Sequence, residues 1–265
     1  MMRVFLVTVL GCAALACGGG KPPAPIGTAA NPADAPADAP APPAPEEITF
    51  PGFDDVPLSG TYYAPISPES KACFIFVHQL SSTRAEWQPI IDRLRGRAHL
   101  FAFDMRGHGA STKGPDGPLS WKTFETADWA KVEHDVGEAN VLLSGKGANR
   151  ACTLVGASIG SSAVLRYAGM YPGGVRALVL LSPGLGYRGL TTPDAARASM
   201  APVLIVHSQE NGAADAAGAL AGIWRDAKVE VEVIADPGQA HGMKILTGDP
   251  QVLERVVAYL IEVAK

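Results

Sequence analysis

Residues 151–171 read ACTLVGASIGSSAVLRYAGMY. An apolar run ends at Val155, the G-x-S-x-G pattern follows at Gly156 to Gly160, and a stretch of helical character comes next. This order predicts a strand, a sharp turn and a helix, a setting that holds a serine in a strained turn with its hydroxyl exposed. The two small glycines let the strand and the helix approach without a side-chain clash. Ser158 is therefore the candidate nucleophile.

On both sides of this turn, short apolar runs alternate with longer stretches of helical periodicity. The last six strand candidates are nearly continuous apolar runs, which is typical of parallel strands covered on both faces. Two strands followed by an alternating series of strands and helices predict an α/β fold with a doubly wound sheet. The strand candidates are residues 47–50, 58–63, 73–78, 100–104, 151–155, 177–181, 203–207 and 229–234; the helix candidates are 82–95, 126–144, 159–171, 214–226 and 251–264.

Three further segments resemble the α/β-hydrolase superfamily. Residues 103–111, FDMRGHGAS, look like the family's D-x-R-G-H-G-x-S turn after the fourth strand. Residues 77–82, VHQLSS, resemble the loop after the third strand, with Gln79 where glycine is usual. His241 follows the eighth strand candidate, where the family keeps its catalytic histidine. The resemblance spans residues 47–265 and implies a mostly parallel, eight-stranded sheet with helices on both faces.

The resemblance also implies a serine mechanism. A serine hydroxyl is a weak nucleophile until a base takes its proton, so Ser158 needs an imidazole within hydrogen-bond reach. Of the six histidines, His241 alone lies in the expected loop and after the serine in chain order. The oxyanion hole is expected from the backbone N–H of Ile159 and from an N–H of the loop after the third strand, most simply that of Gln79.

The acid of the triad is the point where this sequence departs from the family. Residues 207–211 read HSQEN, which puts Asn211 where the family usually has its aspartate. An amide cannot stabilise an imidazolium as a carboxylate does. Three outcomes stay open: Glu210 or Asp215 supplies the carboxylate through a locally shifted loop, Asp236 or another acid does so, or the protein is a weak or non-catalytic hydrolase-like binding protein.

The space for a cap is small. Only residues 183–202 separate the sixth and seventh strand candidates, too few for a large helical lid, so we expect a short cap over an open pocket. Such a pocket suits carboxylic esters of small or medium size, or a peptide-like amide, better than a long-chain lipid. The sequence shows no metal-ligand constellation and no phosphate-binding loop, so the expected chemistry needs neither metal nor cofactor. The hypothesis is a serine carboxylesterase that forms an acyl-enzyme.

The chain divides into three parts. Residues 1–17 form a basic start, an apolar run of 13 residues and small residues before Cys17, which resembles the signal peptide and lipobox of bacterial lipoproteins, with Cys12 as a rival acceptor. Residues 18–45 are a tether rich in Pro and Ala. Residues 46–265 form the hydrolase-like domain. We expect a lipid-anchored protein of the bacterial envelope, on the outer membrane if the organism is Gram-negative, with the domain in the periplasm or outside the cell.

Charge and cysteines restrict the partners and the redox state. The net charge is −4 and the isoelectric point is near 5.9, which argues against nucleic-acid binding. The family's third and fifth strands are neighbours, so the resemblance places Cys73 beside Cys152. A bridge between adjacent parallel strands is strained, so we expect two buried free thiols, with a disulfide as the alternative.

Overall fold

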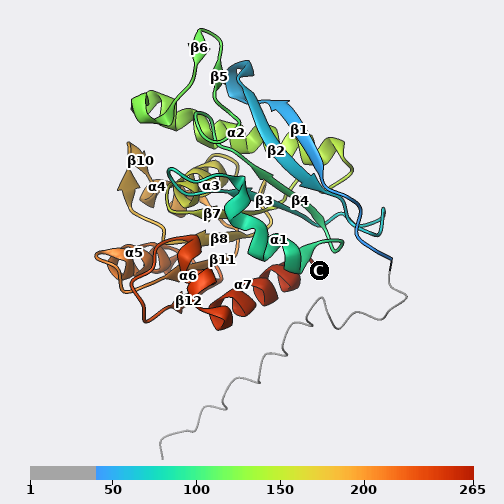
Figure 1. The fold of residues 1–265 in the computed structure, drawn as a ribbon. Helices are drawn as coiled ribbons and strands as arrows, with labels where there is room; N and C mark the ends of the chain where they lie inside the picture. Colours follow the sequence, from blue (N-terminus) through green and yellow to red (C-terminus); the bar gives the residue numbers. More distant parts are fainter. Residues whose placement is uncertain (1–39) are drawn as a thin grey trace, which may run out of the picture.

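The computed structural model describes residues 40–265 (Figure 1). The predicted signal peptide, both candidate lipidation cysteines and most of the tether lie outside these residues. The main sheet has the order β1-β2-β4-β3-β7-β8-β11-β12. All pairs are parallel except β1 with β2 and β2 with β4, so the predicted α/β class with an antiparallel start is confirmed. Its strands are β1 Glu46–Pro51, β2 Pro57–Tyr63, β3 Cys73–Val77, β4 His99–Phe103, β7 Thr153–Ala157, β8 Leu178–Leu181, β11 Val203–His207 and β12 Val231–Ala235.

Helices cover both faces of the sheet because the central strands are apolar on both faces. Phe74 and Phe76 of β3 pack with residues of α1, α6 and α7 in one core. Ile75 and Val77, the alternate residues, pack with α2, α3 and α5 in the other. The helices are α1 Gln88–Leu94, α2 Thr126–Gly145, α3 Ile159–Met170, α4 Pro193–Ala198, α5 Ala213–Asp226, α6 Met243–Gly248 and α7 Pro250–Val263, with 3-10 turns at Phe53–Asp55, Arg84–Trp87 and Trp121–Thr123.

The elements that the sequence pattern missed are short. They are the helices α4 and α6 and the two-residue strands β5 Lys113–Gly114, β6 Gly117–Pro118, β9 Gly186–Tyr187 and β10 Leu190–Thr191. Two residues are too few to show an alternating pattern, and a six-residue helix shows less than two turns of periodicity. The hairpin β9–β10 and α4 together form the predicted short cap between β8 and β11. Among residues 40–265 no helix has the length and apolar character needed to cross a bilayer.

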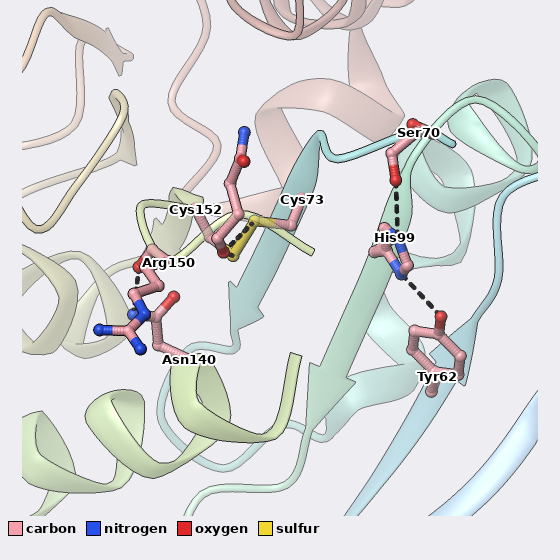
Figure 2. The surroundings of a disulfide bond; sticks show 8 residues. Tyr62, Ser70, Cys73, His99, Asn140, Arg150 and Cys152 are labelled. Atoms are coloured by element: carbon pink, nitrogen blue, oxygen red, sulfur yellow. Dashed lines mark hydrogen bonds between the residues drawn. A yellow bond between two sulfur atoms is a disulfide. The ribbon is translucent and has the colours of Figure 1, made fainter. Parts of the chain in front are cut away.

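A disulfide joins Cys73 and Cys152 at the amino ends of β3 and β7 (Figure 2). The expectation of two free thiols was therefore wrong. The Cα atoms are 4.8 Å apart, within the range of roughly 4.4–6.8 Å that disulfides span. Cys73 is the first residue of β3 and Cys152 precedes β7, so the bridge lies just where the pairing of the two strands begins. The hydrogen bonds between β3 and β7 begin at Phe74 and Thr153, so they restrain the backbone at the cysteines on the side toward the strands and not on the side before them.

The candidate catalytic residues lie at the carboxyl ends of the parallel strands, at the other end of the sheet from the disulfide. In a parallel sheet the carboxyl ends of the strands meet at one edge, where the loops can form a common site. Ser158 follows β7, Ser182 follows β8, Glu210 lies after β11 and His241 lies after β12. The loop that begins at His78 leaves β3 at the same edge.

Candidate active site

Ser158 occupies the sharp turn between β7 and α3. Its backbone has φ 54° and ψ −117°, a conformation that L residues rarely adopt, and its N–H donates to the Leu181 carbonyl at 2.8 Å. The turn needs small neighbours: a Cβ on Gly160 would collide with the backbone carbonyl oxygens of Val77 and His78. The predicted strained elbow is thus present. Within residues 40–265 the Ser158 hydroxyl has no hydrogen-bond partner, and it lines a pocket.

His241 lines the same pocket, and its far ring nitrogen contacts Glu210. His241 Nδ1 donates to the Glu210 carboxylate, at 2.7 Å from each oxygen. In the neutral imidazole this bond places the proton on Nδ1, so that Nε2 is the nitrogen able to act as a base. The carboxylate side chain is 23% exposed and the imidazole 45%, so the pair is reachable by solvent. Serine, histidine and carboxylate therefore occupy one site.

Among the acids considered from the sequence, Glu210 is the one that meets His241. Asn211 and Asp215 are exposed and make no side-chain hydrogen bond in the described part of the chain. Asp236 is buried and accepts the N–H of Gly238 at 2.8 Å, which holds the loop before His241. The Glu210 N–H donates to Ser208 Oγ and its carbonyl accepts the N–H of Ala213. This tight turn brings Glu210 rather than Asn211 toward the histidine.

Of the two N–H groups expected to form the oxyanion hole, one is free to bind a substrate and the other is not. The N–H of Ile159, the first residue of α3, donates to no group within the part of the chain described, and Ile159 lines the pocket. The N–H of Gln79 instead donates to Glu86 Oε1 at 2.8 Å, so the prediction that it points at the substrate is contradicted. The next N–H, that of Leu80, donates to no group among residues 40–265, and Leu80 lines the pocket. Ile159 and Leu80 are the available pair of donors.

Glu86 is a part of the site that the sequence did not reveal. It lies in the 3-10 turn Arg84–Trp87, and its carboxylate anchors the loop through the N–H of Gln79. Burial raises the pKa of Glu86, while hydrogen bonds from Ser82 and Gln79 and the nearby imidazole of His241 act in the opposite direction. An acid among Ser, Thr and Arg carries no sequence signature of this role, since only the folded loop brings it to Gln79.

The pocket has a volume of about 420 Å³. Tyr187 of the cap lines it, while Met105 and Met243 are buried in the core. Leu185 is exposed on the cap beside Tyr187. The pocket is lined by Gln79, Leu80, Ser158, Ile159, Ser162, Ser182, Gly184, Gly186, Tyr187 and His241.

The comparisons agree with this architecture. A family model described as the alpha/beta hydrolase fold matches residues 73–202. A comparison with curated proteins yields no match.

Three solved structures illustrate the likeness in fold. An esterase from Pyrococcus furiosus has a TM-score of 0.66 at 15% identity, over 83% of this chain and 90% of that one. An esterase from Pyrobaculum calidifontis gives 0.62 at 16% identity, over 83% and 86%. The acylaminoacyl peptidase of Pyrococcus horikoshii gives 0.64 at 16% identity, over 83% of this chain but 40% of the peptidase. The family match, the order of the sheet and the serine elbow after β7 show that this chain has the α/β-hydrolase fold.

Proposed function

We propose that this protein is a serine hydrolase that cleaves carboxylic esters of small or medium size. The observation that carries the proposal is the hydrogen bond between His241 and Glu210 beside Ser158 in one pocket. Serine, imidazole and carboxylate in this relation are the parts of an activated nucleophile. The two esterases of similar fold and the small cap over the pocket support an ester substrate.

The reaction proceeds in two halves. His241 Nε2 takes the proton of Ser158 as the serine oxygen bonds to the ester carbonyl carbon, and the N–H groups of Ile159 and Leu80 stabilise the negative oxygen. The carbon–oxygen bond to the alcohol then breaks, and the alcohol leaves with the proton from His241. A water molecule attacks the acyl-enzyme with His241 again as base, releasing the acid and restoring Ser158. Glu210 stabilises the imidazolium in both halves.

A fluorophosphonate probe tests this proposal, because only an activated serine reacts with it rapidly. The protein should be labelled at Ser158 and should hydrolyse p-nitrophenyl acetate, and Ser158→Ala should lose both properties while its circular dichroism stays unchanged. Lack of labelling and of turnover in the folded wild-type protein would refute the enzyme proposal and favour a binding role.

We also propose that the domain is held at the bacterial envelope by lipid on Cys17, at the outer membrane in a Gram-negative cell. Support comes from the lipobox-like residues before Cys17 and from the Cys73–Cys152 disulfide, since disulfides persist mainly in oxidising compartments. In a bacterial host, the full chain should incorporate labelled palmitate and fractionate with membranes. Cys17→Ser should abolish the labelling and Cys12→Ser should not; the reverse pattern would assign the lipid to Cys12.

A further inference from the structure

Two adjacent serines on the first turn of α3 have opposite environments. Ser161 is fully buried, and its hydroxyl bonds the carbonyls of Gly156 at 2.7 Å and Leu181 at 3.0 Å. Ser162 is only 2% exposed, yet its hydroxyl has no hydrogen-bond partner within residues 40–265. Unlike Ser161, Ser162 lines the pocket that holds Ser158. The Ser162 oxygen is not among the enclosed, unpartnered side-chain atoms of residues 40–265, so it is open to the pocket and available to a group that enters.

Ser162 lies in the right place to contact the acyl part of a substrate. It follows Ser158 by four residues, and its N–H donates to the Ser158 carbonyl at 3.3 Å. Four residues correspond to one turn, or roughly 6 Å along the helix axis. An acyl group attached to Ser158 Oγ covers that distance with its carbonyl carbon and the next two atoms, and a hydrogen bond completes it. Ser162 is therefore suited to a polar atom close to the ester carbonyl.

Other polar atoms in the wall point to the same character. Ser182 is 5% exposed, and its Oγ accepts the N–H of Gly242 at 2.9 Å. Its own O–H has no acceptor in the described part of the chain. A pocket built for a plain alkyl chain would not be expected to leave the hydroxyls of Ser162 and Ser182 unpaired.

We propose that the pocket selects acyl groups that carry a hydrogen-bond acceptor two atoms beyond the ester carbonyl carbon, bound by the Ser162 hydroxyl. The ligand class is an alkoxyacyl or similar oxygen-bearing acyl ester rather than a straight alkyl ester. This inference rests on the proposed serine hydrolase activity and specifies its substrate. Sites that form hydrogen bonds discriminate well against analogues that lack the bonding atom, because the buried partner is then left unpaired.

Two esters of nearly equal shape test it. The p-nitrophenyl esters of methoxyacetic and butyric acid differ by one oxygen in place of one methylene. The ratio of their kcat/KM values should fall about tenfold in Ser162→Ala relative to the wild type. The comparison between proteins cancels the higher intrinsic reactivity of the methoxyacetate. Ser161→Ala is the matched control, since its hydroxyl does not reach the pocket, and its ratio should equal that of the wild type.

Each outcome decides the proposal. A ratio in Ser162→Ala equal to that of the wild type overturns the role of Ser162, as does an equal fall in Ser161→Ala. If Ser162→Ala does not fold, Ser162→Cys serves instead, because it is nearly the same size and a poor donor, and the same fall is expected. Failure of the proposed function looks different: the wild type would hydrolyse neither ester and would not react with the fluorophosphonate.

Discussion

His241 Nδ1 and the Glu210 carboxylate, 31 residues apart in the chain, meet at 2.7 Å at the carboxyl edge of the sheet. The carboxylate that contacts the imidazole therefore comes from Glu210. The family resemblance had indicated the next position, which is Asn211. The side chain of glutamate is longer than that of aspartate. Because of this length, Glu210 reaches the imidazole from one residue earlier in the chain.

Removal of the Glu210 carboxylate should lower the turnover strongly. Glu210→Ala is expected to lower kcat on p-nitrophenyl acetate by about 10³ to 10⁴, because the histidine loses the partner that fixes its tautomer and stabilises its charge. Asn211→Asp and Asp215→Ala should change kcat by less than about threefold. A large gain in Asn211→Asp, with little loss in Glu210→Ala, would instead assign the acid position to residue 211.

Glu86 should act as a positioning residue. Because its carboxylate accepts the N–H of Gln79, it holds the loop so that the N–H of Leu80 borders the pocket. Glu86→Ala should reduce kcat by about tenfold with little change in KM, as expected when an interaction made only in the transition state is weakened. Glu86→Gln keeps the accepting oxygen and should recover most of the activity. Equal losses in both variants would show that the negative charge, rather than the anchor, is what matters.

The disulfide should stabilise the fold without affecting the chemistry. It closes a loop with a sequence separation of 79 residues, and the chain-entropy relation gives about 4.5 kcal/mol for a loop of that length. Reduction with a phosphine should lower the free energy of unfolding by about that amount in urea titrations. The double variant Cys73→Ala, Cys152→Ala should not respond to the reductant. At low temperature its kcat should match that of the wild type, because the bridge lies at the edge of the sheet opposite Ser158. A reduced kcat would link the bridge to the site.

Stability should decrease as the pH falls below neutrality. His78 is fully buried; its Nδ1 donates to the Gln79 carbonyl at 2.7 Å and its Nε2 accepts the Met105 N–H at 3.0 Å, so it is held neutral. Burial lowers the pKa of His78 to about 4. Between about pH 6.5 and 4 the unfolded chain binds a proton that the folded one does not. The free energy of unfolding therefore decreases as the pH is lowered through this range, by roughly 3 kcal/mol in total.

Burial also lowers the pKa of His99 and of His108, so these two residues act in the same direction. Urea titrations from pH 7.5 to 4.5 measure the slope, and nitrogen-15 spectra of the imidazoles assign it. A His78 ring that becomes protonated above pH 6 in the folded protein would contradict the prediction.

The sequence alone determined the local features of this protein. The strand candidates correspond to all eight strands of the main sheet. The central strands β3, β4, β7, β8 and β11 were the clearest, because burial on both faces requires consecutive apolar residues. Gly156 to Gly160 predicted the serine turn, since its conformation and its close packing depend on residues adjacent in the chain. The histidine was found by its place after the last strand.

The tertiary structure decided the contacts between distant segments. Whether Glu210, Asn211, Asp215 or Asp236 meets His241 depends on the turn after β11. This turn is fixed by the hydrogen bonds from the Glu210 N–H to Ser208 Oγ and from the Ala213 N–H to the Glu210 carbonyl. The N–H of Gln79 is unavailable to a substrate because Glu86 accepts it. The pairing of Cys73 with Cys152 depends on where β3 and β7 begin to pair. A side chain's partner is set by positions and directions to within about an ångström in three dimensions. Hydrophobic periodicity records only whether a residue is buried, so it specifies the sheet but not these partners.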